Sequence, residues 1–224
     1  MESFERAEPS WIDVALIPEK TKALTRGGPG RIEGSIRLGL PIVRAITHDE
    51  LDAATARQHR ADLATFRYHL VQLACSLRPP DGEHFGRAFI HVKLEGGTDE
   101  APVIAYSLDP MERTITEGRS TRIGIGADLG LISIEAEHER TASREVATVV
   151  AYGVRTGEPS WELKRAGGRV LQGSYYFAIL TRSPIGIRTR GTVSLTATIE
   201  KWRFVTLESA FPDGKTAAFT IEVP

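Results

Sequence analysis

Cysteine is almost absent from this chain of 224 residues, in which Cys75 is the single example. A disulfide within the chain is therefore excluded, and one unpaired thiol is typical of a protein from a reducing compartment. No apolar run approaches the roughly 18 residues that a transmembrane helix needs. The acidic first segment, MESFERAEPSW, has no apolar core like that of a secretory signal. These absences predict a cytoplasmic protein without a transmembrane segment.

An excess of charge of one sign is also missing, because 28 basic residues stand against 29 acidic residues and the formal net charge is −1. No overall field then draws the whole chain onto nucleic acid or an anionic membrane. Hydrophobic residues make up 41% and charged residues 25%, which is ordinary globular composition. This length and composition suit one large domain or two small ones.

Recognisable catalytic and metal-binding motifs are absent as well. The six histidines include no H-x-H or H-x-x-x-H pair, and no G-x-S-x-G elbow marks a nucleophile. The glycines at 124, 126 and 130 lack dinucleotide spacing and precede a predicted strand rather than a helix. The glutamates at 135, 137 and 139 are interpreted as a solvated strand face. We therefore predict no catalytic residue, no metal and no cofactor.

The segment with the strongest local signals is predicted to be a long helix, from about residue 49 to residue 77. Thr47 and Glu50 have the spacing of a capping box, and prolines follow at 79 and 80. Apolar residues recur at steps of three and four, as on one helix face: Leu63, Phe66, Leu70, Leu73 and Leu77. A second stripe predicts another contact, with the N-terminal arm, a sister helix or a second subunit: Ala54, Ala61, Ala64, Tyr68, Val71 and Cys75.

Beyond Gly82 the hydrophobic period changes to two, which is typical of strands. The clearest alternation runs from Thr192 to Ile199. About eight strands with short turns are predicted, so this part is interpreted as an antiparallel β-sandwich. The expected fold class is α+β in one globular unit, with an N-terminal arm and short strands over 1–45, the long helix over 46–80 and the β-sandwich over 81–224.

Charge is unevenly distributed along the chain, and this is its main functional signal. Residues 81–145 have thirteen acidic and seven basic side chains, whereas residues 155–190 have two acidic and seven basic ones. Aromatic residues at 175–177 lie between basic turns, a combination used by proteins that bind single-stranded nucleic acid. Opposite charges also suit self-association or a charged protein partner. The candidate contact surface comprises Lys164, Arg165, Arg169, Arg182, Arg188 and Arg190, together with Tyr68 and Cys75.

The predicted function is a non-catalytic intracellular module for protein–protein binding or assembly, with another protein or a second copy of the chain as partner. One alternative is a binder of an anionic ligand or nucleic acid that uses the basic turns between 164 and 190. Another is a small hydrolase whose site is assembled from distant residues. A third is a β-sandwich that permeabilises membranes, which the amphipathic segment from Trp11 to Leu24 suggests.

Overall fold

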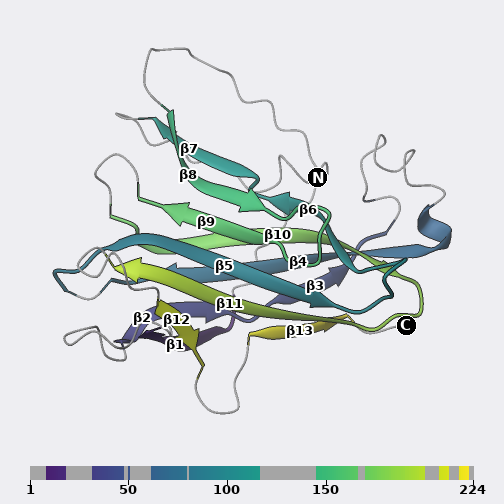
Figure 1. Cartoon of the computed structure of the whole chain (residues 1–224), viewed down its shortest axis with the longest axis horizontal. Coiled ribbons are helices and arrows are strands. Elements are labelled where there is room, and N and C mark those ends of the chain that lie inside the picture. Colours follow the sequence, from purple (N-terminus) through teal and green to yellow (C-terminus); the bar gives the residue numbers. More distant parts are fainter. Residues whose placement is uncertain are drawn as a thin grey trace.

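The chain folds into a single antiparallel sheet, as a computed structural model shows (Figure 1). The structure describes residues 9–18, 32–47, 50, 62–79, 81–116, 145–165, 170–199, 207–211 and 217–221. The strands are β1 (Trp11–Pro18), β2 (Ile32–Gly39), β3 (Ile42–Ala45), β4 (Phe66–Leu77), β5 (Phe85–Glu95), β6 (Ile104–Asp109), β7 (Glu112–Thr116), β8 (Glu145–Tyr152), β9 (Ser160–Lys164), β10 (Gly173–Pro184), β11 (Thr189–Ile199), β12 (Leu207–Ala210) and β13 (Ala218–Ile221). A short 3-10 helix, η2 (Asp62–Ala64), precedes β4.

The strand order explains how the sheet becomes nearly closed. It runs β6-β10-β4-β2-β1-β12-β11-β5-β9-β8-β7, with β3 added to β4 and β13 added to β11. The end strands β6 and β7 are neighbours along the chain. Ala105 of β6 also exchanges two backbone hydrogen bonds with the turn after β8, accepting from Arg155 at 2.7 Å and donating to Thr156 at 2.8 Å. The sheet therefore curls over and presents two layers to each other.

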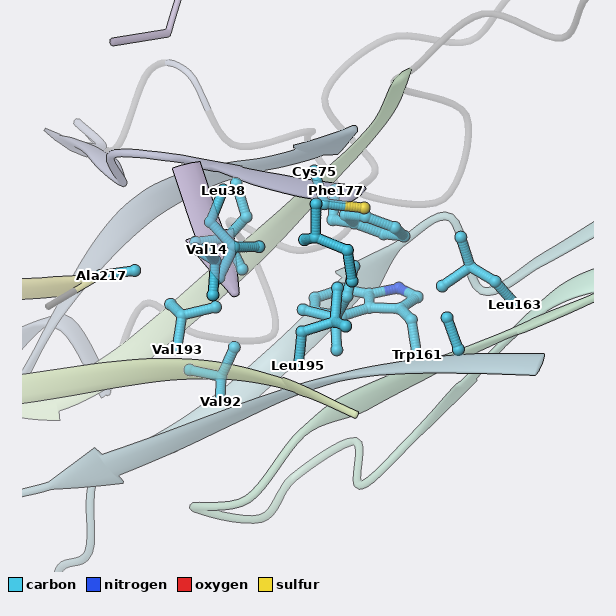
Figure 2. Close-up of a cluster of buried hydrophobic side chains, with 14 of the residues drawn as sticks. Val14, Leu38, Cys75, Val92, Trp161, Leu163, Phe177, Val193, Leu195 and Ala217 are labelled. Atoms are coloured by element: carbon cyan, nitrogen blue, oxygen red, sulfur yellow. The ribbon is translucent and has the colours of Figure 1, made fainter. Parts of the chain in front are cut away.

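The core fills the space between these layers (Figure 2). Val14, Leu38, Cys75 and Phe177 point inward from β1, β2, β4 and β10, while Val193, Leu195 and Trp161 point inward from the opposite layer. Trp161 is fully buried, its ring centroid lies 4.9 Å from that of Phe177, and its Nε1 donates to the carbonyl oxygen of Pro110 at 2.9 Å. Since β9 and β10 are far apart in the strand order, this contact joins the two layers.

The predicted helix is wrong where it can be compared with the structure, because residues 66–77 form β4 and no α-helix occurs in the described ranges. Val71, Leu73, Cys75 and Leu77 point into the core, whereas Tyr68 and Leu70 belong to a small apolar cluster on the other side of the strand. A strand buried on both faces carries a nearly continuous apolar run, and such a run also contains residues at steps of three and four. The fold is therefore all-β, and the expected α+β class is corrected.

The start of that predicted helix is only partly described. Glu50 accepts a hydrogen bond from the Thr47 backbone N–H at 2.8 Å and one from the Thr47 hydroxyl at 2.9 Å. These contacts hold the pKa of Glu50 near 2, with help from Arg44. Residues 51–61, which include Ala54 and Ala61 of the predicted second stripe, lie outside the described ranges.

Several strand predictions are confirmed. The alternating segment from Thr192 to Ile199 lies within β11, and its inward residues are buried as the pattern indicated. Within the predicted N-terminal arm, Trp11–Pro18 forms β1. It lies between β2 and β12 in the same sheet as the C-terminal strands. The glycine-rich segment 124–130 and the glutamates at 135–139 lie outside the described ranges.

Candidate functional site

The candidate site lies on the outer side of four neighbouring strands, β11, β5, β9 and β8. Side chains directly opposite each other in an antiparallel pair point to the same side of a sheet, so the register gives the layout of this surface. We call it the β5 outer face. Its rows, from β11 through β5 to β9, are Thr198–Arg87–Lys164, Thr196–Phe89–Glu162 and Ser194–His91–Ser160, and Val150 and Tyr152 of β8 complete it.

Glu162 is the centre of the polar part of this face. Its side chain is only 5% exposed, and three groups satisfy its carboxylate. The Nε of Arg87 lies 2.9 Å from one oxygen, the Nζ of Lys164 lies 2.9 Å from the other, and the Tyr152 hydroxyl donates to that second oxygen at 2.8 Å. The Arg87 and Lys164 side chains remain 54% and 36% exposed. A buried carboxylate thus fixes two cations and a hydroxyl at the edge of the solvent.

These contacts also fix the protonation states. Burial acts to raise the pKa of Glu162, but hydrogen bonds from Lys164 and Tyr152 and the charge of Arg87 outweigh it, so the pKa lies below its ordinary value. The hydrogen bond to Glu162 is the main cause that raises the pKa of Tyr152. At neutral pH the face therefore presents an ionised Glu162 and a protonated Tyr152 hydroxyl.

An aromatic pair lies beside this polar cluster. The rings of Phe89 and His91 are stacked, with centroids 5.7 Å apart and planes inclined by 13°. The Nε2 of His91 lies 3.3 Å from the hydroxyl oxygen of Thr196, and partial burial lowers the pKa of His91. No described carboxylate contacts His91. This histidine and hydroxyl therefore lack the orienting third group of a catalytic triad.

The structure separates the predicted contact residues along β5. Lys164 pairs in register with Arg87 near the start of that strand, whereas Arg190 pairs with Glu95 at its end. Eight residue steps of about 3.4 Å separate these positions, so the two basic groups lie roughly 27 Å apart. Arg165 follows Lys164 directly, and Arg169 lies outside the described ranges. The basic turns therefore do not form one compact patch.

The remaining predicted residues differ in how accessible they are. Arg188 is exposed in the turn after β10. Arg182 is half-buried, because its guanidinium lies 4.3 Å from the centre of the Phe66 ring and 3.4 Å from a carboxylate oxygen of Asp62. Tyr68 is 2% exposed and packs edge-on against Tyr106, with centroids 5.6 Å apart.

Cys75 is fully buried among the core residues, and burial raises the pKa of its thiol. Tyr68 points to the opposite side of β4. The helical stripe that connected these two residues is therefore replaced by the two faces of one strand.

Sequence reasoning missed Arg87, Phe89, Tyr152 and Glu162. A usable signal was present, because the parity that turns His91 away from Ile90 and Val92 also turns Arg87 and Phe89 away from them. The alternation in Trp161-Glu162-Leu163-Lys164 likewise puts Glu162 and Lys164 on one side. What the sequence did not contain was the register that brings these two strands and β8 together.

The described residues offer neither a metal site nor a membrane-spanning helix. No group of three or more histidine, cysteine, aspartate or glutamate side chains is arranged to hold a metal ion there. Among those same residues, no helix is long and apolar enough to span a bilayer.

Comparison with known proteins adds no family assignment: no protein-family model matches the chain, and no curated protein matches it.

Proposed function

We propose that this protein is a non-catalytic protein-binding module that docks a partner with acidic groups on its β5 outer face. The observation that supports the proposal is the Glu162 cluster, in which two cations are held at a partly exposed surface by one buried carboxylate. Charged groups fixed before binding lose little side-chain entropy on association, which favours specific recognition. The cytoplasmic location expected from the sequence stays a prediction.

The composition of the face also suits a protein partner. Arginine and aromatic residues are enriched in the centres of protein interfaces. Here Arg87, Phe89 and Tyr152 occupy adjacent rows, and Tyr152 is 45% exposed although it is a large side chain. Threonine and serine side chains of β11 border them on one side, as polar rims border many interfaces.

Single-stranded nucleic acid is the second candidate ligand, because a specific observation favours it. The stacked rings of Phe89 and His91 lie between the Arg87–Lys164 pair and Lys93 on the same face. Aromatic side chains flanked by cations form stacking platforms for single strands. Against this, Lys93 lies 2.8 Å from a carboxylate oxygen of Glu95, and Lys93 and Arg190 together lie near two carboxylates, those of Glu95 and Glu158. The cations near Glu162 therefore carry the surplus charge of this face.

Site-specific photo-crosslinking in the native cell tests the protein-binding proposal. A photoreactive phenylalanine replaces Phe89 in one variant and Tyr152 in a second. In a matched control it replaces Leu40, which is 40% exposed and directly follows β2, a strand of the other layer. We expect one protein adduct shared by positions 89 and 152 and absent from position 40.

Competition then shows whether the adduct depends on the face. Purified wild-type protein should suppress the adduct, and the Arg87→Glu variant should not. Failure to form a shared adduct, or equal suppression by both competitors, would refute the protein-binding proposal. Oligonucleotide binding that weakens steeply with salt would support the nucleic-acid candidate instead.

A further inference from the structure

We propose that the Arg87–Lys164 pair is a binding site for a single carboxylate group. An aspartate or glutamate in an acidic segment of the partner protein supplies this group. This inference rests on the proposed function and names the chemistry of the contact. Three observations carry it: the direction from which Glu162 holds Arg87, the surplus charge of the cluster, and the apolar ring beside it.

The first observation concerns the arginine fork. Glu162 binds Arg87 through Nε, and no other hydrogen bond or ion pair of this guanidinium occurs among the described residues. The Arg87 side chain is 54% exposed, so its guanidinium remains within reach of a partner. Two parallel N–H donors at this spacing match the two oxygens of a carboxylate. Glu162 therefore acts as a positioning residue for a guanidinium that remains exposed to solvent.

The second observation is the charge of the cluster. Arg87 and Lys164 contribute two positive charges and Glu162 one negative charge, so the cluster has a surplus of one positive charge. Lys164 uses one contact on Glu162, which leaves further donors on its ammonium group. A monoanion that accepts from both cations neutralises this surplus, as one carboxylate does.

The third observation separates a protein segment from a nucleic acid strand. A strand presents a phosphate at every nucleotide and needs a track of cations. On this face the other cations, Lys93 and Arg190, lie near the carboxylates of Glu95 and Glu158. The next cation along β5, Lys93, is paired with Glu95 at 2.8 Å. Phe89 lies between Glu162 and Thr196 in register, so an apolar neighbour of the bound carboxylate meets its ring. An acidic residue beside an apolar one in an extended segment matches this arrangement.

Fluorescence anisotropy with a labelled oligoglutamate peptide tests the proposed carboxylate-binding site. An oligothymidylate of equal length serves as the second probe. Arg87→Lys keeps the charge and removes the fork, and Lys164→Gln removes the second cation. Arg37→Lys is the matched control for the first change, because the Nε of Arg37 also lies near a carboxylate, 3.0 Å from Asp13 on the other layer. Arg78→Gln, which removes an exposed charge directly after β4 in the other layer, is the control for the second. Near-ultraviolet circular dichroism checks that each variant is folded.

We expect Arg87→Lys and Lys164→Gln to weaken oligoglutamate binding about tenfold each, since each removes a charge-assisted contact. Both controls should stay within about twofold of the wild type, because they lie on the other layer, away from the Arg87–Lys164 pair. If Arg87→Lys and Arg37→Lys weaken oligoglutamate binding equally, the proposed carboxylate-binding site is wrong. The crosslinking result, and thus the proposed function, would then still stand. Tighter binding of the oligothymidylate, with the same dependence on Arg87, would also overturn the proposed carboxylate-binding site.

Discussion

Replacing Glu162 by glutamine tests how much the buried carboxylate contributes to the stability of the sheet. The substitution keeps the size of the side chain and removes its charge, so the ion pairs with Arg87 and Lys164 are lost together. The Tyr152 hydroxyl keeps an oxygen to which it can donate. The change therefore isolates the electrostatic part of the cluster.

The expected loss of stability depends on how deeply each partner of Glu162 is buried. A hydrogen bond to a charged group contributes about 1.5–3 kcal/mol when both partners are shielded. Glu162 is shielded, but Arg87 and Lys164 are 54% and 36% exposed and regain water when the charge is removed. We therefore expect Glu162→Gln to lower the free energy of unfolding by about 1–2 kcal/mol at neutral pH.

The effect has a defined pH dependence. The pKa of Glu162 lies below its ordinary value of 4.5 in the folded protein, so the unfolded chain takes up a proton first as the pH falls. The stability that ionisation contributes is complete above the unfolded pKa and is lost as the pH falls through the folded pKa. The difference between wild type and Glu162→Gln should therefore be constant around neutral pH and shrink in acid.

Urea unfolding, followed by tryptophan fluorescence at neutral and acid pH, measures this difference. Glu95→Gln is the matched control, because Glu95 also pairs with a lysine, at 2.8 Å, but its side chain is 49% exposed. We expect no measurable change from the control. If the two substitutions have the same effect at neutral pH, burial of Glu162 does not strengthen its contacts and the reasoning is wrong.

Three further predictions concern the core. Trp161→Phe removes roughly 40 Å3 of side chain and the hydrogen bond to Pro110. Urea unfolding should therefore show that the free energy of unfolding falls by about 2 kcal/mol. A change near zero would mean that the core collapses around the smaller ring. Gly191→Ala should cost about 1–3 kcal/mol in the same assay, because a Cβ there would overlap the Phe219 ring; an unchanged midpoint would show that this ring moves aside. The buried Cys75 thiol should resist a thiol reagent in the native protein and react fully in denaturant, and rapid native labelling would contradict its place in the core.

The local hydrophobic pattern was enough to predict some strands of the sheet, but it led to a wrong prediction for another strand. In β11 every second residue is apolar, only one side of the strand is buried, and the alternation predicted both the strand and its inward side chains. In β4 both sides are buried, so alternation disappears and the residues from Phe66 to Leu77 resemble a helix. The capping-box residues Thr47 and Glu50 contact each other as predicted, but such a contact extends over one turn and does not decide what the next twenty residues form.

By itself, the sequence determined the properties that depend on residue type and local period: no internal disulfide, the strand character of residues 192–199, and the side of β5 to which residues 89–94 point. The tertiary structure decided which strands are neighbours and at what register, and therefore which side chains meet. Glu162 is two residues from Lys164 but 75 from Arg87, and only the pairing of β5 with β9 brings the three groups together. The reason is physical, because side-chain direction is set by the local backbone, whereas cross-strand neighbours depend on burial across the whole sheet.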